Sequence, residues 1–195
     1  MRGWILAATV CAILWPAFTV GCQAVPDTAT YQRIKAFLDE VPIIDTHDHL
    51  KPFDQLHPYV ETENGRGVNL YSVWGRSYWG SQYKRLTPWT PGGPFDEWWS
   101  RAKGDFDDAR ALSQYRYQLP AFEDLYGIDF EQITDEQAAE LNRRIFENYR
   151  DQKWLYHVVT ERANIELMLN DRYWAALDFK TYYPFEAIIL NVGRL

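Results

Sequence analysis

The sequence predicts an α/β fold in which a few buried parallel strands are separated by long helical segments. Three short, mostly apolar stretches predict the strands, at residues 42–46, 164–170 and 185–192. Within the last of them, residues 187–190 are all apolar, which is typical of a strand buried on both faces of a parallel sheet. Between the first two stretches apolar residues recur at helical spacing, which predicts a long helical insertion.

The N-terminus has the layout of a secretory signal, which we expect to occupy residues 1–21. Arg2 is followed by a largely apolar run over residues 4–20. This segment also resembles a bacterial lipobox, although Thr19 stands where that pattern usually has leucine, and the resemblance implies lipidation of Cys22. An uncleaved anchor is the alternative, but a spanning helix needs about 20 apolar residues. We therefore expect export from a bacterial cell, to the periplasm or to a lipid anchor.

Residues 28–40 predict a helix that leads directly into the first strand, because their apolar side chains fall at helical spacing. These side chains are Tyr31, Ile34, Phe37 and Leu38. The strand at residues 42–46 follows almost at once and is entered through Pro42, a position that a strand tolerates.

Two histidines, His47 and His49, follow the first strand with one residue between them. Residues two apart on a strand share a face, so both rings project together while Asp48 turns the other way. Two neutral imidazoles side by side can bind one divalent metal ion. Asp45 could orient the pair through a hydrogen bond. The alternative is a histidine pair that binds nothing, and the aliphatic run before it favours the metal site.

Residues 43–50 resemble the first-strand signature of the amidohydrolase superfamily, the metal-dependent (β/α)8-barrel hydrolases. The aliphatic lead, the acidic residue and both histidines occur in the same order. The resemblance implies that His47 and His49 ligate a catalytic divalent metal, commonly zinc. The long helical stretch before the second strand, and the region 161–171, resemble the uronate isomerase-like branch of that superfamily.

This resemblance predicts a partial (β/α)8 TIM barrel, with about its first three strands and a helical insertion over about residues 51–163. A full barrel takes about 250 residues, whereas this chain has 195. In the superfamily, further metal ligands and the catalytic acid come from later strands. We therefore expect residues 22–195 to be the N-terminal part of an amidohydrolase-like domain that is inactive alone.

The first part of the insertion is irregular and rich in proline, glycine and aromatic residues. The aromatic content argues against disorder, and residues 69–84 predict a helical segment over the barrel mouth. One interpretation is a substrate-covering lid lined by Trp74, Arg76 and Trp79. The other, which we favour, is that the rings pack the insertion's own core.

The rest of the insertion predicts helices with recognisable ends. One helix begins at Phe95, after Pro94, and another covers residues 106–126, with a break near Pro120 and a stop at Gly127.

A further helix begins at Thr134, whose side chain forms a capping box with Gln137, and runs to about Arg150. Residues 154–162 predict one more helix, on which His157 has an ordinary structural role.

Two further residues are candidates for substrate binding. Arg116 offers a bidentate fork for a carboxylate, although a solvated helix charge is its ordinary role. Asn170 stands with Asp171 at the C-terminal end of the second strand, where the active sites of barrels lie.

The composition limits the function further. The net charge is −7, and no basic run exceeds two residues, which argues against a nucleic-acid surface. Cys11 lies in the expected signal, so Cys22 alone remains and a cysteine-based zinc site is excluded. A small-molecule substrate is expected, and the oligomeric state stays open.

Three functions remain on the sequence alone. The first is metal-dependent hydrolysis of an amide, ester or related bond. The second is isomerisation of a sugar acid of the uronate type. The third is a non-catalytic exported fragment with a vestigial metal site.

Overall fold

The computed structural model describes residues 28–83, 85–174 and 179–189. The expected signal segment and Cys22 lie outside these residues, so export and lipidation stay predictions. The chain divides into two units, Met1–Val41 and Pro42–Leu195. Within the described ranges, no helix has both the length and the apolar character needed to cross a bilayer.

The first unit contributes helix α1, Ala29–Glu40, which matches the helix predicted there. Thr28 caps it, because its side-chain oxygen accepts a hydrogen bond from the backbone N–H of Tyr31. The helix ends at Val41, which is extended, as the residue before a proline prefers. None of its residues is buried, so its apolar stripe is exposed.

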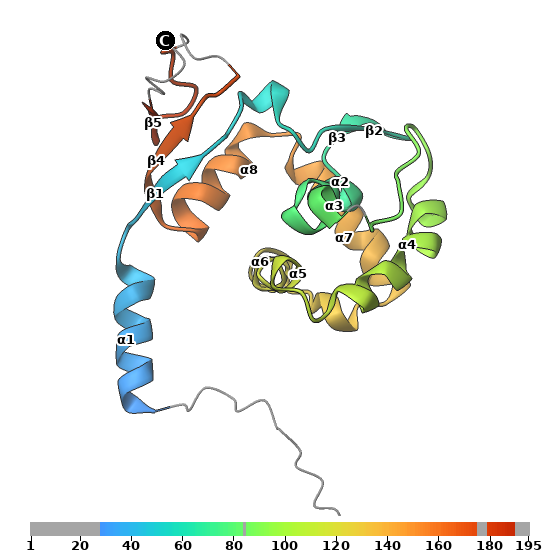
Figure 1. Cartoon of the computed structure of the whole chain (residues 1–195), viewed down its shortest axis with the longest axis horizontal. Helices are drawn as coiled ribbons and strands as arrows, with labels where there is room; N and C mark the ends of the chain where they lie inside the picture. The colour runs from blue at the N-terminus through green and yellow to red at the C-terminus, as the bar shows by residue number, and fades with distance from the viewer. Residues whose placement is uncertain (1–27, 84, 175–178, 190–195) are drawn as a thin grey trace, which may run out of the picture. The chain divides into compact units, whose positions relative to one another are not determined.

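The second unit contains a three-stranded parallel sheet, which Figure 1 shows next to helix α8 (Gln152–Tyr156). It consists of β1 (Ile43–Asp48), β4 (Ile165–Asp171) and β5 (Glu186–Ile189), in the order β1-β4-β5. All three strands fall on the apolar stretches that predict them. The structure therefore has the mixed α/β class and the small parallel sheet expected from the sequence. The expected burial of the first strand is wrong, because Ile43 and Ile44 of β1 are 49% and 56% exposed.

The register of the sheet brings the ends of β1 and β4 together. Ile43 lies opposite Ile165, and Asp48 lies opposite Asn170. The pairing is irregular between Asp45 and Asp48. Because the strands are parallel, their carboxyl ends meet at one edge, which places the residues after β1 beside the end of β4.

A short antiparallel hairpin follows β1 and was not predicted. It pairs β2 (Val60–Thr62) with β3 (Gly65–Gly67). The turn residues are Glu63 and Asn64, and Gly65, the first residue of β3, has a φ of 100°, which favours glycine. Gly67 is required for packing, because a Cβ there would lie 2.4 Å from the Phe146 ring.

Helices make up most of the insertion. They are α2 (Leu70–Arg76), α3 (Tyr78–Tyr83), α4 (Phe95–Ala109), α5 (Ser113–Arg116), α6 (Leu119–Tyr126), α7 (Asp135–Asn148) and α8 (Gln152–Tyr156), with 3-10 turns at Phe53–Gln55 and Phe130–Gln132 and a π-helix at His157–Arg162.

The helix predicted over residues 106–126 is wrong in its extent. The first helix continues to Ala109, and the chain then breaks at Leu112, which is extended. Pro120 lies in the first turn of α6, where a proline is tolerated, rather than breaking a longer helix. Gly127 ends α6 in the left-handed conformation, as predicted.

Capping boxes fix the starts of two helices. The predicted box of Thr134 and Gln137 is confirmed at α7. A second one, formed by Asn69 and Ser72, starts α2. Each box satisfies two backbone N–H groups that a helix start would otherwise leave without partners.

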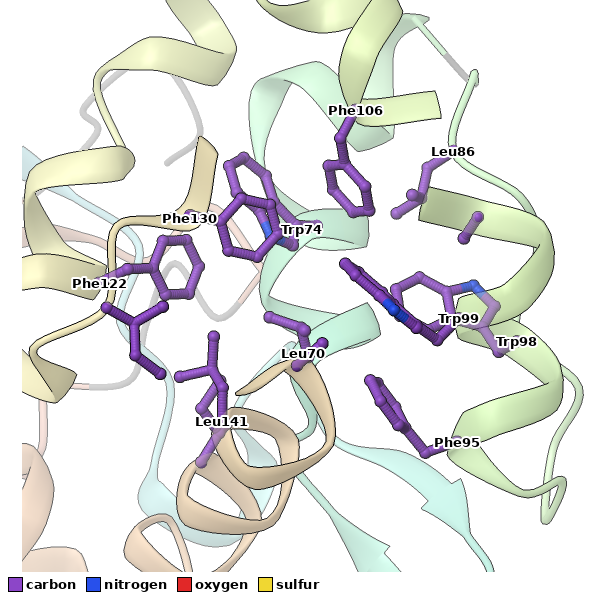
Figure 2. Close-up of a cluster of buried hydrophobic side chains, with 14 of the residues drawn as sticks. Leu70, Trp74, Leu86, Phe95, Trp98, Trp99, Phe106, Phe122, Phe130 and Leu141 are labelled. Carbon is purple, nitrogen blue, oxygen red and sulfur yellow. The ribbon is translucent and has the colours of Figure 1, made fainter. Parts of the chain in front are cut away.

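The aromatic side chains form a core inside the insertion, with Trp74 at its centre (Figure 2). The Trp74 ring stacks on Tyr115 at 5.0 Å and on Phe122 at 5.3 Å between centroids. Phe106 and Phe130 contact the same indole. Such rings bury large apolar areas and add favourable pair geometry, so the insertion has a core of its own.

Burial of a tyrosine in this core makes stability sensitive to alkaline pH. Tyr115 is 1% exposed, and burial raises its pKa to about 12. Its phenol stabilises the fold fully below pH 10, and this contribution is lost as the pH rises through 12. Between pH 9 and pH 11 we expect a loss of roughly 1.4 kcal/mol in the free energy of unfolding from this group.

Urea unfolding at the two pH values measures this effect. Tyr115→Phe should lose less stability over the interval than the wild type, whereas Tyr117→Phe should behave like the wild type, because Tyr117 is 54% exposed. Equal pH dependence in all three proteins would show that the Tyr115 phenol ionises at its ordinary pKa.

Candidate metal centre

The two histidine rings lie together at the carboxyl end of β1. The ring centroids of His47 and His49 are 4.7 Å apart, with the planes nearly perpendicular. His47 is exposed and His49 is half-buried. The alternation of side chains along β1, which predicts a shared direction for the two rings, accounts for this contact.

A carboxylate from the neighbouring strand joins the pair. One ligand atom from each of His47, His49 and Asp171 lies within 4.8 Å of the other two. Asp171 is the last residue of β4. The sequence predicts it only beside Asn170, as a site candidate at the end of the second strand. The Oδ1 atom of Asp171 is buried and has no hydrogen-bond partner among the residues that the structure describes. A buried carboxylate oxygen without a donor is costly, and a cation at this point would satisfy it.

A hydrogen bond across the two strands fixes the orientation of His49. Its Nδ1 lies 2.7 Å from the backbone carbonyl oxygen of Asp171. A carbonyl can only accept, so Nδ1 carries a proton, and in the neutral ring Nε2 is then the nitrogen with the lone pair. The Nε2 atom is therefore the one available to a metal, in the arrangement that metal-binding histidines usually have.

Asp45 and Asp48 are the two acidic residues of β1, and Asp45 does not make the expected contact with a histidine ring. Asp45 accepts a hydrogen bond from the backbone N–H of His47 at 3.1 Å, so it braces the main chain rather than a ring. Asp48 is not part of the three-residue cluster, as expected for a residue between the two histidines, although it lines the pocket that both histidines line. Burial raises the pKa of the Asp48 carboxyl, and the nearby charge of Asp45 raises it further.

A buried amide holds the chain just after the pair. The Asn170 side chain donates to the carbonyl oxygen of Leu50 at 2.6 Å and to Glu186 Oε1 at 2.8 Å. Asn170 is 0% exposed. It therefore positions the segment after His49, and its burial leaves it no surface on which to contact a substrate.

Glu186 and its neighbours hold the segment after His49 at a second point, the carbonyl group of Lys51. Its Oε2 accepts from the backbone N–H groups of Tyr182, at 2.8 Å, and Tyr183, at 3.3 Å. The Tyr183 hydroxyl donates to the carbonyl oxygen of Lys51 at 2.8 Å. Arg172 forms a buried ion pair with Glu186. The carbonyls of Leu50 and Lys51 are thus both held by side chains from the region of β4 and β5.

A pocket of about 500 Å³ opens beside the histidine pair. It is lined by His47, Asp48, His49, Leu50, Lys51, Leu56, His57, Pro58, Tyr78, Tyr149 and Leu155. This volume lies in the range of small-molecule sites.

Trp174 is a neighbour of the site that sequence reasoning missed. Its ring centroid lies 6.3 Å from that of His49 and 6.5 Å from that of His57. It belongs to no motif and follows β4 in an irregular segment, so only the strand pairing could have indicated it.

The remaining predicted site residues lie elsewhere. Trp74 and Trp79 are 0% and 1% exposed within the aromatic core, which agrees with the packing interpretation rather than with a lid. Arg76 and Arg116 are exposed, and neither lines the pocket. His157 pairs with Glu161 at 2.9 Å on the π-helix and is not part of the three-residue cluster.

Comparisons with known proteins add no relative. The chain matches no protein-family model, no curated protein and no solved structure. Its function therefore has to be argued from the site itself.

Zinc titration of the metal-free chain tests the cluster. We expect a single Zn²⁺ site by calorimetry, weakened in His49→Ala and in Asp171→Asn by more than the roughly 10–100-fold that outer partners of a metal site contribute. His157→Ala is the matched control and should bind zinc like the wild type. Equal affinity in all four proteins would show that the cluster does not hold the metal.

Proposed function

We propose that the chain carries the metal centre of a hydrolase of the amidohydrolase type. The observation that carries this proposal is the convergence of His47, His49 and Asp171 at one sheet edge. Two imidazole nitrogens and a carboxylate oxygen are a donor set that suits zinc. The buried Oδ1 of Asp171 and the free Nε2 of His49 both fit a cation at this point.

The same proposal extends to the fold. The parallel strands β1, β4 and β5 follow one another in the sheet in chain order, with the candidate site at their carboxyl edge. That is the arrangement of consecutive strands in a (β/α)8 barrel, whose active sites lie at this edge. We propose that the sheet is part of such a barrel, with the helical insertion between its first two strands.

Three protein ligands leave a fourth position open for water, which distinguishes catalytic from structural zinc sites. His47, His49 and Asp171 would hold the metal, which would supply an activated water and a Lewis acid for a carbonyl. The residues of this chain supply the positioning. His49 is oriented through its Nδ1–H, and Asp45 braces the backbone of His47. The adjoining pocket has room for a small substrate.

Hydrolysis of an activated ester tests the proposal. The sequence predicts that the chain lacks the catalytic acid of later strands, but 4-nitrophenolate leaves without protonation. The zinc-loaded chain should therefore hydrolyse 4-nitrophenyl acetate faster than the same concentration of free zinc, because a metal held at the site would supply a nucleophilic water near neutral pH. The rate should fall to the free-zinc level in His49→Ala and persist in His157→Ala.

Two other outcomes would contradict the proposal. Tight zinc binding without any rate above free zinc would favour a vestigial site. Conversion of D-glucuronate to its keto isomer, without ester hydrolysis, would favour the uronate-type isomerase that the long insertion between β1 and β4 also suggests.

A further inference from the structure

One side of the pocket beside the histidine pair carries basic side chains, and Lys51 supplies its positive charge. Lys51 and His57 both line it and both face Trp174. The Nζ atom of Lys51 lies 5.3 Å from the centroid of the Trp174 ring, and the His57 ring lies 6.5 Å from the same centroid. His49 also contacts this ring. The side chains of Lys51, His57 and His49 therefore all lie around the Trp174 indole, next to the candidate metal centre.

Among the described residues, Lys51 forms no ion pair with a carboxylate. Burial lowers the pKa of His57, and the charge of Lys51 lowers it further, so the ammonium acts on the side chain next to it in the pocket lining. The net charge of the chain is −7, whereas this part of the pocket carries a positive charge without a carboxylate partner among the described residues.

The backbone that carries Lys51 is fixed. Its carbonyl oxygen accepts the hydrogen bond from the buried Tyr183, and that of Leu50 accepts one from Asn170. Lys51 itself is half-buried, with its ammonium over the Trp174 ring. Binding an anion at this ammonium therefore requires little ordering of the main chain, which favours affinity.

Other side chains that line the pocket are apolar or aromatic. Leu56, Pro58, Tyr78, Tyr149 and Leu155 come from the segment after β1, from α3, from the end of α7 and from α8. Such a surface suits the hydrocarbon or aromatic body of a small molecule, whereas a few polar groups fix its orientation.

We propose that the pocket takes a small organic anion, whose carboxylate lies at Lys51 and whose apolar body lies along Leu56, Tyr149 and Leu155. The assignment of this anion as the substrate rests on the proposed function, because it places the reacting bond toward His47, His49 and Asp171. The negative charge of Asp48 on the metal side of the pocket favours the carboxylate at the Lys51 side.

Binding of benzoate and benzamide to the metal-free chain tests this proposal without relying on the metal. The two probes have nearly the same shape and differ in charge. Ligand-observed NMR titration should show benzoate binding about tenfold more tightly than benzamide, since only benzoate forms a charge-assisted contact with Lys51. Lys51→Gln should abolish that preference.

Lys103→Gln is the matched control, because Lys103 is a surface lysine paired with Asp135, and it should keep the preference. Equal binding of the two probes, or an unchanged preference in Lys51→Gln, would overturn the proposal. Benzoate binding that appears only after zinc is added and is insensitive to Lys51→Gln would also overturn it. Failure of zinc binding or of ester hydrolysis would leave the metal-free result intact, so the two proposals fail separately.

Discussion

The parallel pairing of β1 with β4 is the constraint on which the candidate site depends. Neither strand alone brings metal-binding side chains from different parts of the chain together. Side by side, they place the two rings of β1 next to the carboxylate of Asp171, and the Asp171 carbonyl sets the proton position on His49. The pairing begins at the Ile43 N–H, which donates to the carbonyl oxygen of Asn164 at 2.8 Å. A shift of register would separate the donors.

The insertion between β1 and β4 has a folded core of its own, which helps the two strands to pair. The entropy cost of closing a loop rises only slowly with its length, and an ordered insertion also holds the two ends of the loop in place. The aromatic core around Trp74 gives the segment its own buried apolar area. The network of Asn170, Glu186 and Tyr183 then fastens the residues after His49 to β4 and β5. The site is thus held by main-chain carbonyls as well as by strand pairing.

Much of this could be predicted from local patterns, and the rest depends on contacts far apart in sequence. The capping box at Thr134, the stop at Gly127 and the three strands are local signals, and the structure confirms them. Asp171 was predicted only as a secondary candidate beside Asn170, because its place next to the two histidines exists only once β4 lies beside β1. The contacts that the Asn170 Nδ2 makes with Leu50 and Glu186 depend on the same strand pairing and could not be predicted.

The protonation state of His49 in the metal-free chain tests the account most directly, because it reports the β1–β4 contact and the availability of Nε2 together. Long-range ¹H–¹⁵N NMR spectra assign the protonated nitrogen of each histidine. The account predicts a proton on Nδ1 of His49, and a shift of its Nε2 signal on addition of zinc. A proton on Nε2, or an Nε2 signal unmoved by zinc, would contradict it.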